Sequence, residues 1–425
     1  MKIIIIGSGL IGVSTAYFLS QQGHAVQVLD RKDGAGMDTS FANGGMLTPS
    51  QAEPWNQPGI FWKALAWLGN ENSPFLVRPR AVFSILGWGL GFIRNSTRQR
   101  YYANMHKNAR LASYSIQMVR ELRQKHDLHY DENTRGTLKI FTEQKNFQEA
   151  VKHSRFYKEL DIAFRILDAK EVIELEPSLS ALRSTIVGGV HYPGDESGDA
   201  HKFCRSLAAQ AEQSGVNFNF QVEVSGFEYE HNKITAVKTS SGNYSADVYV
   251  LAAGSYSTLL AGSLNISLPV RPVKGYSLTL DINGWDNGPK LPVVNESLHI
   301  AMTPLGSRLR VAGTAEINGY DVNIRQSRVN HMIRYVTQVY PGLAGTLGQD
   351  AVTTWTGLRP YSSDGVPILG KTPFNNLYLN TGHGHLGWSM AAGSGRLVSD
   401  IICGNVPFLD PEPYRLGRQA VKKSF

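Results

Sequence analysis

Residues 2–12 read KIIIIGSGLIG, an apolar run followed by three spaced glycines. Within the run Lys2–Ile6, every residue after Lys2 is isoleucine, a β-branched residue. Such a run is typical of a buried parallel strand. Gly7, Gly9 and Gly12 then form the pattern G-x-G-x-x-G. In a strand–turn–helix unit, these glycines allow a tight turn, a close approach of backbone to a pyrophosphate, and packing of helix on strand. The stretch therefore predicts a dinucleotide-binding unit.

The residues that follow complete this unit. An apolar stretch with helical periodicity ends at Gly23, and Ala25–Leu29 predicts a second strand. Asp30 stands at the end of that strand, where a carboxylate accepts hydrogen bonds from a ribose. Arg31 would suit the 2′-phosphate of NADP, but Asp30 would repel that phosphate, so we do not favour NADP.

The expected nucleotide-binding sheet does not continue directly. Residues 36–48 form a polar, glycine-rich loop, an aromatic stretch follows, and strand-like segments resume only much later. We therefore expect the sheet to be completed after a long insertion. The expected later strands are Val216–Phe220, Val222–Phe227, Ile234–Thr239, Tyr244–Leu251 and Leu377–Asn380.

A second glycine-rich loop lies near the C-terminus. Residues 381–389 read TGHGHLGWS and lead into a helix of small residues over 390–402. The N-terminus of such a helix stabilises negative charge, including that of a reduced flavin ring. A plain glycine-rich turn is the alternative reading. Two such loops at opposite ends of the chain favour a long cofactor that spans the domain.

The composition excludes several classes of protein. Of 425 residues, 42 are glycine, about one in ten against an average of about 7%. The hydrophobic fraction of 42% excludes a disordered chain, and 2 cysteines cannot build a disulfide framework. The net charge of +7 comes without a basic stripe, so we expect no nucleic-acid partner. No metal-ligand spacing occurs, and we predict no metal site.

No Asp, Glu, Lys or Arg occurs between Lys2 and Asp30, but glycines interrupt this stretch and no small-residue cleavage site follows. A buried strand and helix explain this run better than a signal peptide or a membrane span. Together with the low cysteine count, this predicts a cytoplasmic location.

The chain resembles the flavin-dependent D-amino-acid oxidase superfamily, and within it the bacterial D-amino acid dehydrogenases. Six motifs carry the resemblance in the same order: IIIIGSGLIG at 3–12, SFANGG at 40–45, VLAAGSYS at 250–257, RPVKGYSLT at 271–279, GLRPYSSDGVPILG at 357–370 and NTGHGHLGW at 380–388.

The resemblance implies an α/β fold, in which a Rossmann-like FAD-binding domain is interleaved with an α+β substrate domain built on an antiparallel sheet. The FAD-binding domain is expected at 1–50, 200–265 and 350–425, and the substrate domain at 51–199 and 266–349. FAD is expected to bind without a covalent link, since no cysteine lies near the GLRP motif.

The activity that the resemblance implies is oxidative deamination of D-amino acids to 2-oxo acids and ammonia. Hydride passes to FAD, and electrons pass onward to a quinone or another respiratory acceptor. One alternative is an amine or imino-acid dehydrogenase or oxidase for glycine, sarcosine, D-proline or hydroxyproline. Another is a flavin-binding subunit whose chemistry lies in a partner chain.

Three residues are predicted to serve the substrate. A guanidinium holds a carboxylate bidentately, and the resemblance assigns this clamp to Arg359, which a pure binding subunit would not need. Tyr276 is a candidate for a second contact to the substrate carboxylate or for a lid contact. The alternative is that it is a half-buried strand tyrosine. His385 occupies a position where some amine oxidases carry a substrate-binding group, whereas close dehydrogenases carry a small polar residue, so it leaves the substrate open.

The predicted cofactor-binding residues come from all the glycine-rich motifs and their neighbours. They are Gly7, Ser8, Gly9, Leu10, Ile11, Gly12, Asp30, Arg31, Lys32, Thr39, Ser40, Ala42, Asn43, Gly44, Gly45, Met46, Leu47, Val224, Ala252, Ala253, Gly254, Gly357, Arg359, Gly382, His383, Gly384, His385, Leu386, Gly387 and Trp388.

Residues 55–95 are rich in aromatic side chains. The uncharged run Ala81–Ile93 is too short to span a bilayer, and arginines flank it. The segment resembles an interfacial element, which would place the protein on the inner face of the bacterial cytoplasmic membrane with access to quinone. The alternative is a buried helical part, or lid, of the substrate domain.

Overall fold

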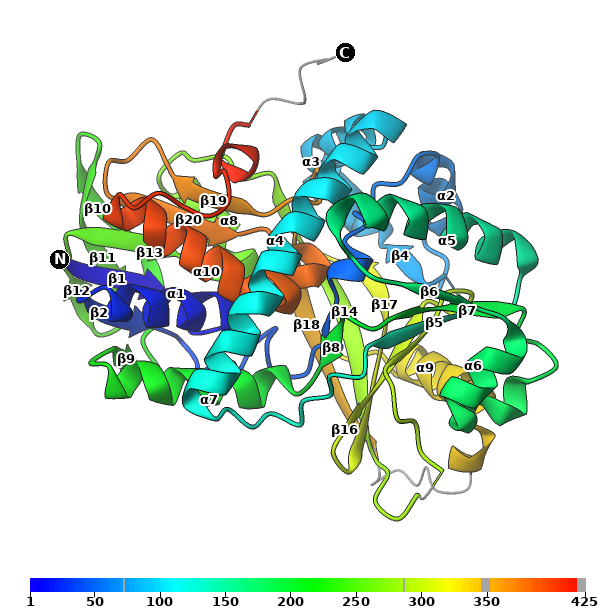
Figure 1. Cartoon of the computed structure of the whole chain (residues 1–425). Coiled ribbons are helices and arrows are strands. Elements are labelled where there is room, and N and C mark those ends of the chain that lie inside the picture. The colour runs from blue at the N-terminus through cyan, green and yellow to red at the C-terminus, as the bar shows by residue number, and fades with distance from the viewer. Residues whose placement is uncertain (72, 286, 345–351, 419–425) are drawn as a thin grey trace.

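The structure, a computed structural model, describes residues 1–71, 73–285, 287–344 and 352–418. Two large β-sheets lie side by side, and helices cover both (Figure 1). One sheet contains the first strand of the chain, and the other contains the longest strands. The glycine-rich loops lie between the two sheets, at the end of the first.

The first sheet has six strands in the order β19-β20-β13-β1-β2-β9. All neighbours pair in parallel except β19, an antiparallel edge strand. Both faces of its centre are covered, which explains why Ile3 to Ile5 are fully buried. The strands are β1 (Lys2–Ile6), β2 (Ala25–Leu29), β9 (Asn217–Asn219), β13 (Val248–Leu251), β19 (Ile368–Lys371) and β20 (Leu377–Thr381).

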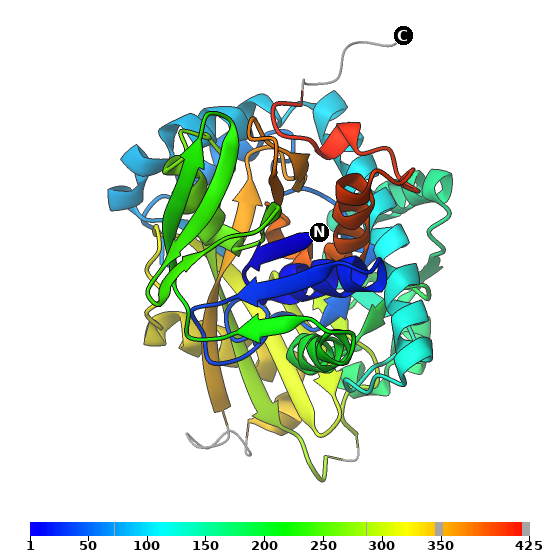
Figure 2. The ribbon, with the colours of Figure 1, turned by 90° about the vertical axis from the view of Figure 1, so that its left-hand side faces the viewer.

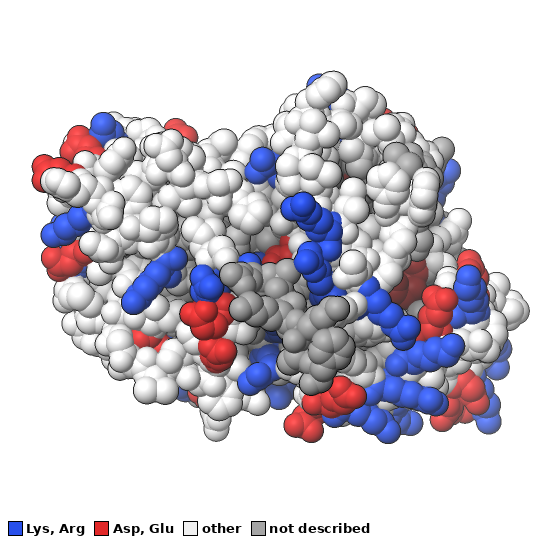
Figure 3. All heavy atoms as spheres, turned by 90° about the horizontal axis from the view of Figure 1, so that it is seen from above, with Lys and Arg blue, Asp and Glu red and all other residues white. Residues whose placement is uncertain are grey.

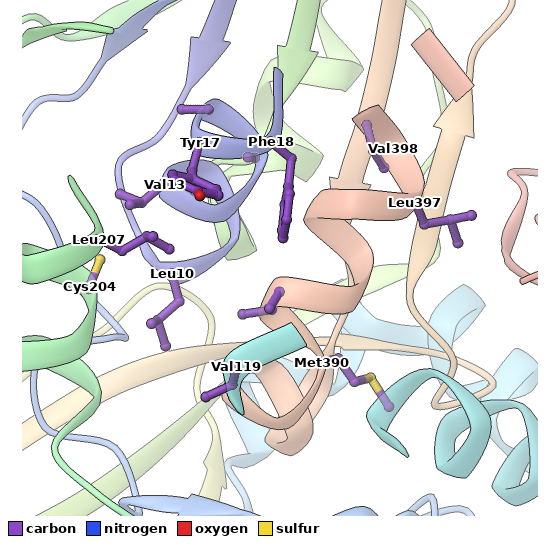
Figure 4. Close-up of a cluster of buried hydrophobic side chains, with 14 of the residues drawn as sticks. Leu10, Val13, Tyr17, Phe18, Val119, Cys204, Leu207, Met390, Leu397 and Val398 are labelled. Carbon is purple, nitrogen blue, oxygen red and sulfur yellow. The ribbon is translucent and has the colours of Figure 1, made fainter. Parts of the chain in front are cut away.

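Four helices form a layer on one face of this sheet: α1 (Leu10–Gln21), α4 (Arg98–His126), α7 (Ala200–Gln213) and α10 (Gly387–Cys403). Figure 4 shows side chains of all four helices meeting in one buried cluster, with Val13 and Phe18 of α1 facing α7 and α10. Helix α4 begins after Thr97, which caps its N-terminus by accepting a hydrogen bond from the backbone N–H of Arg100.

A separate three-stranded antiparallel sheet covers the opposite face, with the order β10-β11-β12 (Figure 2). The bounds are Val224–Glu230, Lys233–Thr239 and Gly242–Tyr244. Two predicted strands, Val222–Phe227 and Ile234–Thr239, therefore lie outside the nucleotide-binding sheet. The predicted strand Tyr244–Leu251 is wrong as one element, because Tyr244 ends β12 and β13 begins only at Val248.

The second sheet is mixed and follows the order β18-β14-β17-β16-β15-β5-β7-β6, with β4 paired to β17. Its strands are β4 (Phe75–Val77), β5 (Thr137–Phe141), β6 (Arg165–Leu167), β7 (Gly188–Tyr192), β14 (Val270–Asp281), β15 (Val293–Asn295), β16 (Ile300–Leu305), β17 (Arg308–Ile317) and β18 (Val352–Ser362). A second hydrophobic core lies between this sheet and α6 (Ala169–Leu175) and α9 (Gln326–Val339). The short strands β3 (Met46–Leu47) and β8 (Glu196–Ser197) pair with each other.

The aromatic segment contains α2 (Ile60–Trp67), β4 and α3 (Val82–Arg94). The aromatic side chains of this segment differ in burial. Trp88 is buried and donates a hydrogen bond of 2.9 Å from Nε1 to the carbonyl oxygen of Tyr361. Phe83 is 83% exposed. Part of the segment thus belongs to the core, and part of it faces outward.

Two elements cross the predicted domain boundaries. Strand β18, expected in the FAD-binding part, pairs with β14 in the mixed sheet. Helix α4, expected in the substrate part, packs on α10. The remaining helices are α5 (Gln144–Tyr157) and α8 (Ser257–Gly262). Among the described residues, no helix is long and apolar enough to cross a membrane.

Candidate active site

A cavity of about 1450 Å³ lies between the two sheets. Most of the predicted site residues line its wall, including Arg359, Tyr276 and His385. Five predicted cofactor-binding residues do not line it: Ser8, Gly12, Lys32, Leu47 and Gly382.

The first glycine-rich loop forms one end of the cavity. Gly7 has a φ of +108°, and a β-carbon there would lie 2.6 Å from the carbonyl oxygen of Ala252. Only glycine meets both conditions without strain. Helix α1 begins at Leu10 without a side-chain cap from Gly9 and without an acidic residue in its first turn. Backbone N–H groups and the positive end of the helix dipole therefore face the cavity, as a pyrophosphate requires.

Asp30 lies beside this loop. One carboxylate oxygen accepts hydrogen bonds from the backbone N–H of Ser8 at 2.6 Å and from its hydroxyl at 2.8 Å. The other oxygen accepts from the backbone N–H of Lys32 at 2.8 Å. Arg31 instead pairs with Asp38 at 2.8 Å and lies over the ring of Tyr256. The guanidinium of Arg31 is thus engaged locally.

The loop with the sequence SFANGG is held by the mixed sheet. The carbonyl oxygens of Ala42, Asn43 and Gly44 accept hydrogen bonds from side chains of β14, β17 and β16. Its first residue, Ser40, accepts a hydrogen bond of 3.1 Å from the backbone N–H of Leu10. The loop therefore connects the start of α1 to the second sheet.

The second glycine-rich loop joins β20 to α10 and lines the middle of the cavity. His383 is buried, and burial lowers the pKa of its imidazole to about 3, so the ring is neutral at neutral pH. Its Nε2 is 3.1 Å from the hydroxyl of Ser394. In the described part of the chain, its Nδ1 and the Nε1 of Trp388 have no hydrogen-bond partner. Such buried polar atoms indicate a ligand.

Arg359 extends from β18 over Gly275 of β14. Its Nη1 donates a hydrogen bond of 3.3 Å to the carbonyl oxygen of Thr314, and the guanidinium carbon lies 5.6 Å from the centre of the Trp55 ring. No ion pair joins Arg359 to any carboxylate of the described residues. Burial lowers the pKa of Arg359 to about 10, which leaves it charged at neutral pH. A buried cation without a counter-ion attracts an anionic ligand.

Three aromatic rings lie beside this cation. The ring of His385 stacks on Trp55 with centroids 5.1 Å apart, and Trp55 stacks on Tyr361 at 4.8 Å. Burial, followed by the charge of Arg359, lowers the pKa of His385 to about 3. His385 is therefore an uncharged part of the wall at neutral pH.

Tyr276 differs from the expectation. Its ring lines the cavity, but its hydroxyl donates a hydrogen bond of 2.8 Å to Glu316. Burial raises the pKa of this hydroxyl, and the adjacent carboxylate raises it further. Because the proton is committed to Glu316, the hydroxyl is not a donor to a substrate carboxylate here.

Sequence reasoning missed several residues of the wall. Trp55 was seen only as part of an aromatic segment, and Lys139, Glu53 and Glu296 were not considered. The one local signal was the lysine inside the otherwise apolar strand TLKIF of β5, all of whose residues are buried. Glu53 and Glu296 lie in loops, and nothing in the local sequence brings them to Lys139.

The sequence of the chain matches a family model and is similar to known proteins. The model of the family described as FAD dependent oxidoreductase (DAO) matches residues 2–401. The chain is 43% identical over 420 residues to a D-amino acid dehydrogenase of Granulibacter bethesdensis, with 99% of this chain and 100% of the relative covered.

Solved structures share the fold. A glycine oxidase from Geobacillus kaustophilus has a TM-score of 0.76 at 21% identity, with 98% of each chain covered. An L-proline dehydrogenase from P. horikoshii has a TM-score of 0.77 at 18% identity, with 98% of this chain and 96% of that chain covered.

Proposed function

Because the chain belongs to the FAD dependent oxidoreductase family, we propose that it is a D-amino acid dehydrogenase. It would oxidise D-amino acids to imino acids, which water hydrolyses to 2-oxo acids and ammonia. The observation that carries the proposal is the charged guanidinium of Arg359, which faces the cavity and pairs with no carboxylate of the described residues. The relative that is 43% identical along nearly its whole length supports the choice of substrate class.

The residues of the cavity fit FAD. The start of α1, whose N-cap residue Gly9 supplies no side-chain hydrogen bond, would hold the pyrophosphate together with Gly7, and Asp30 would accept hydrogen bonds from the ribose. The unpartnered ring nitrogens of His383 and Trp388 supply hydrogen-bonding atoms beside the second loop. The uncapped start of α10 adds a positive dipole end for the flavin ring.

When bound, FAD supplies the acceptor for the hydride that leaves the α-carbon of the substrate. Arg359 binds the α-carboxylate through two parallel N–H···O bonds and so fixes the α-carbon in place. Trp55 packs against Arg359 and His385, which restricts the rotation of both.

The α-amino group must be neutral when hydride leaves. A buried positive charge at Arg359 and an uncharged His385 both disfavour an ammonium nearby, so they promote loss of that proton to water. The mechanism therefore assigns no side chain the role of base. The work of the protein is orientation and electrostatics.

For the electron acceptor and the location, we infer a quinone at a membrane surface. Six exposed apolar side chains form what we call the α2–α3 patch: Phe61, Trp62, Phe83, Leu86, Leu90 and Ile93. Those of α3 are spaced by three and four residues, so they lie on one face of the helix. Leu86, Leu90 and Ile93 also line the cavity, which gives a lipid-soluble acceptor a short path inward.

The surroundings of the patch suit an anionic membrane. Arg94 ends α3 and Arg98 begins α4, and both are exposed. Seen from the side on which α3 lies in Figure 1, the molecule presents broad uncharged areas with Lys and Arg beside them (Figure 3). An apolar face with basic residues at its edge is typical of interfacial binding.

The deciding experiment for the reaction uses the purified chain with its flavin. We expect D-amino acids, added without oxygen, to bleach the flavin absorbance and to reduce a dye in steady state, whereas their L-enantiomers do neither. Glycine, sarcosine and D-proline belong in the same panel. Bleaching by one of these alone would favour the alternative activity, and no bleaching by any amine would overturn the proposal.

A further inference from the structure

Beyond Arg359 and His385, the same cavity extends along the mixed sheet to a second group of charged side chains. Lys139 of β5, Glu53 and Glu296 line this part of the wall, which we call the charged lobe. Lys139 is only 7% exposed. The mechanism proposed above uses none of these three residues. A buried lysine costs free energy unless it is paired, so its presence calls for an explanation.

Two carboxylates hold this lysine. The Nζ of Lys139 lies 3.2 Å from Glu296 and 3.8 Å from Glu53. Burial lowers the pKa of Lys139, but the two carboxylates more than offset this and raise it, so the ammonium stays charged. One ammonium against two carboxylates leaves the lobe with a net charge of −1. The Glu296 side chain keeps 35% of its surface exposed, so that it can meet a ligand.

The lobe and the carboxylate clamp both lie near one residue of the cavity wall, His385. The positive charges of both Arg359 and Lys139 lower the pKa of His385, after the larger effect of burial. The imidazole therefore lies within electrostatic reach of both. Arg359 belongs to β18 at the edge of the mixed sheet and Lys139 to β5 further along it, so a molecule bound by Arg359 and extended along this sheet would point toward the lobe.

Uncharged polar groups complete the lobe. Tyr101, Asn146 and Tyr192 line the same region of the wall. The hydroxyl of Tyr101 is buried and has no hydrogen-bond partner among the described residues. Such a hydroxyl provides an acceptor for an N–H donor as well as a donor. The lobe is therefore better suited to a polar group than to an aliphatic side chain.

We propose that the charged lobe selects D-amino acids whose side chains end in a guanidinium or an ammonium group. This inference rests on the proposed function and adds the class of side chain. Such a substrate is negative at its α-carboxylate and positive at its far end. The same cavity offers both complementary charges, the cation Arg359 and the net negative lobe.

An acidic side chain fits the lobe less well. It would have to compete with Glu53 and Glu296 for Lys139 while facing their repulsion. A guanidinium, in contrast, pairs with a carboxylate bidentately and leaves Lys139 its second partner. An aliphatic side chain forms no ion pair or hydrogen bond in the lobe. The lobe therefore does not favour a substrate with such a side chain.

The test compares two cationic substrates, D-arginine and D-lysine, with the uncharged D-norleucine and the acidic D-glutamate. We expect kcat/KM to be highest for the two cationic substrates. Glu296→Gln should lower kcat/KM for D-arginine about tenfold to a hundredfold, the value of one charge-assisted hydrogen bond. It should leave D-norleucine within about twofold, because that side chain makes no such bond.

The matched control is Glu212→Gln. Glu212 is an exposed glutamate of α7 that does not line the cavity, and its substitution should leave all four substrates unchanged. A binding measurement separates recognition from turnover. δ-Guanidinovalerate has the carboxylate and the guanidinium of arginine without the amino group, and we expect it to compete at least tenfold better than hexanoate. Glu296→Gln should abolish that advantage.

The outcomes distinguish the two proposals. Failure to oxidise any D-amino acid overturns the proposed function. Efficient oxidation of D-norleucine, with no preference for D-arginine and no selective effect of Glu296→Gln, overturns the role of the lobe and leaves the proposed function standing. A preference for D-glutamate would show that the lobe selects acidic side chains, which would overturn the proposed preference for cationic ones.

Discussion

Gly275 leaves the space that the guanidinium of Arg359 fills. A β-carbon built on Gly275 would lie 2.5 Å from both Nη1 and Nη2 of Arg359. The two residues belong to neighbouring strands, β14 and β18, in which Gly275 is paired with Gly357. The position of the carboxylate clamp is therefore set by the absence of a side chain on the next strand.

This contact predicts the effect of Gly275→Ala. The added methyl group must displace the guanidinium, and misplacing a binding group by about 1 Å costs on the order of a hundredfold in rate. We expect a loss of kcat/KM for D-amino acids on that order, with the ratio of flavin to protein unchanged. Gly226→Ala is the control, because a β-carbon there meets nothing within 4 Å. Full activity of Gly275→Ala would show that Arg359 does not bind the substrate where it now lies.

The first glycine of the opening motif makes a separate prediction about the cofactor. Gly7→Ala should yield protein with little or no bound FAD, because the β-carbon would meet Ala252 and because φ is +108°. Flavin absorbance per protein after gel filtration measures the effect. Gly23→Ala isolates backbone strain from the site, since Gly23 also has a positive φ, of +78°, but a β-carbon there has open space. Equal loss of FAD in both variants would argue for misfolding rather than for a pyrophosphate site.

The opening thirty residues could be predicted from sequence because their interactions are local. The alternation of β-branched residues, glycines and helical periodicity specifies β1, the turn and α1 directly, and all were confirmed. The break between Tyr244 and Val248 was missed. The composition of a run of strand-forming residues does not indicate which sheet the run joins. Here its first part belongs to β12 of the three-stranded sheet and its last part to β13 of the six-stranded sheet.

The site residues that lie in sequence motifs were predicted. The residues that only the fold brings to the site were missed. Arg359 and His385 lie in motifs, and both line the cavity. Lys139 and Glu296 are brought together only by the pairing of β5 with β15, a contact between distant parts of the chain. The hydrogen bond from Tyr276 to Glu316 was not foreseen, because Glu316 lies on a different strand, β17. Such long-range pairing is not encoded in local periodicity.

The buried imidazole of His383 predicts an acid dependence of stability. Its pKa in the folded state is about 3, below the ordinary value of 6.5. The unfolded chain therefore binds the proton more readily, so the stabilisation is complete above about pH 6.5 and is lost as the pH falls toward 3. The loss is at most about 1.4 kcal/mol per pH unit, or roughly 2 kcal/mol between pH 6.5 and pH 5.

His383→Gln tests this dependence, because glutamine keeps hydrogen-bonding capacity but does not titrate. We expect the variant to be less stable than the parent at pH 7, through its altered contact with Ser394, and to lose less stability on acidification. Thermal melting of the holoenzyme at pH 7 and pH 5 measures both effects. His129→Gln is the control, since the His129 side chain is 77% exposed. Parallel pH curves for the parent and His383→Gln would contradict the prediction.

The α2–α3 patch makes the last prediction, about the membrane. Phe83 and Leu90 are 83% and 64% exposed on the same face of α3, and burying each in a bilayer interface is worth about 1.5–3 kcal/mol. The double substitution Phe83→Glu and Leu90→Glu should therefore weaken sedimentation with anionic phospholipid vesicles by at least about a hundredfold. It should also slow reduction of a long-chain quinone in those vesicles, while leaving dye reduction in solution intact.

Two comparisons make this test specific. Val406→Glu replaces another apolar side chain that is 95% exposed, outside the patch, and should leave vesicle binding unchanged. Added salt should weaken the binding of the parent chain, because Arg94 and Arg98 contribute through screened charge. If the double variant bound vesicles as well as the parent, the patch would be assigned to a protein partner or to a lid, and the quinone would have to reach the cavity from water.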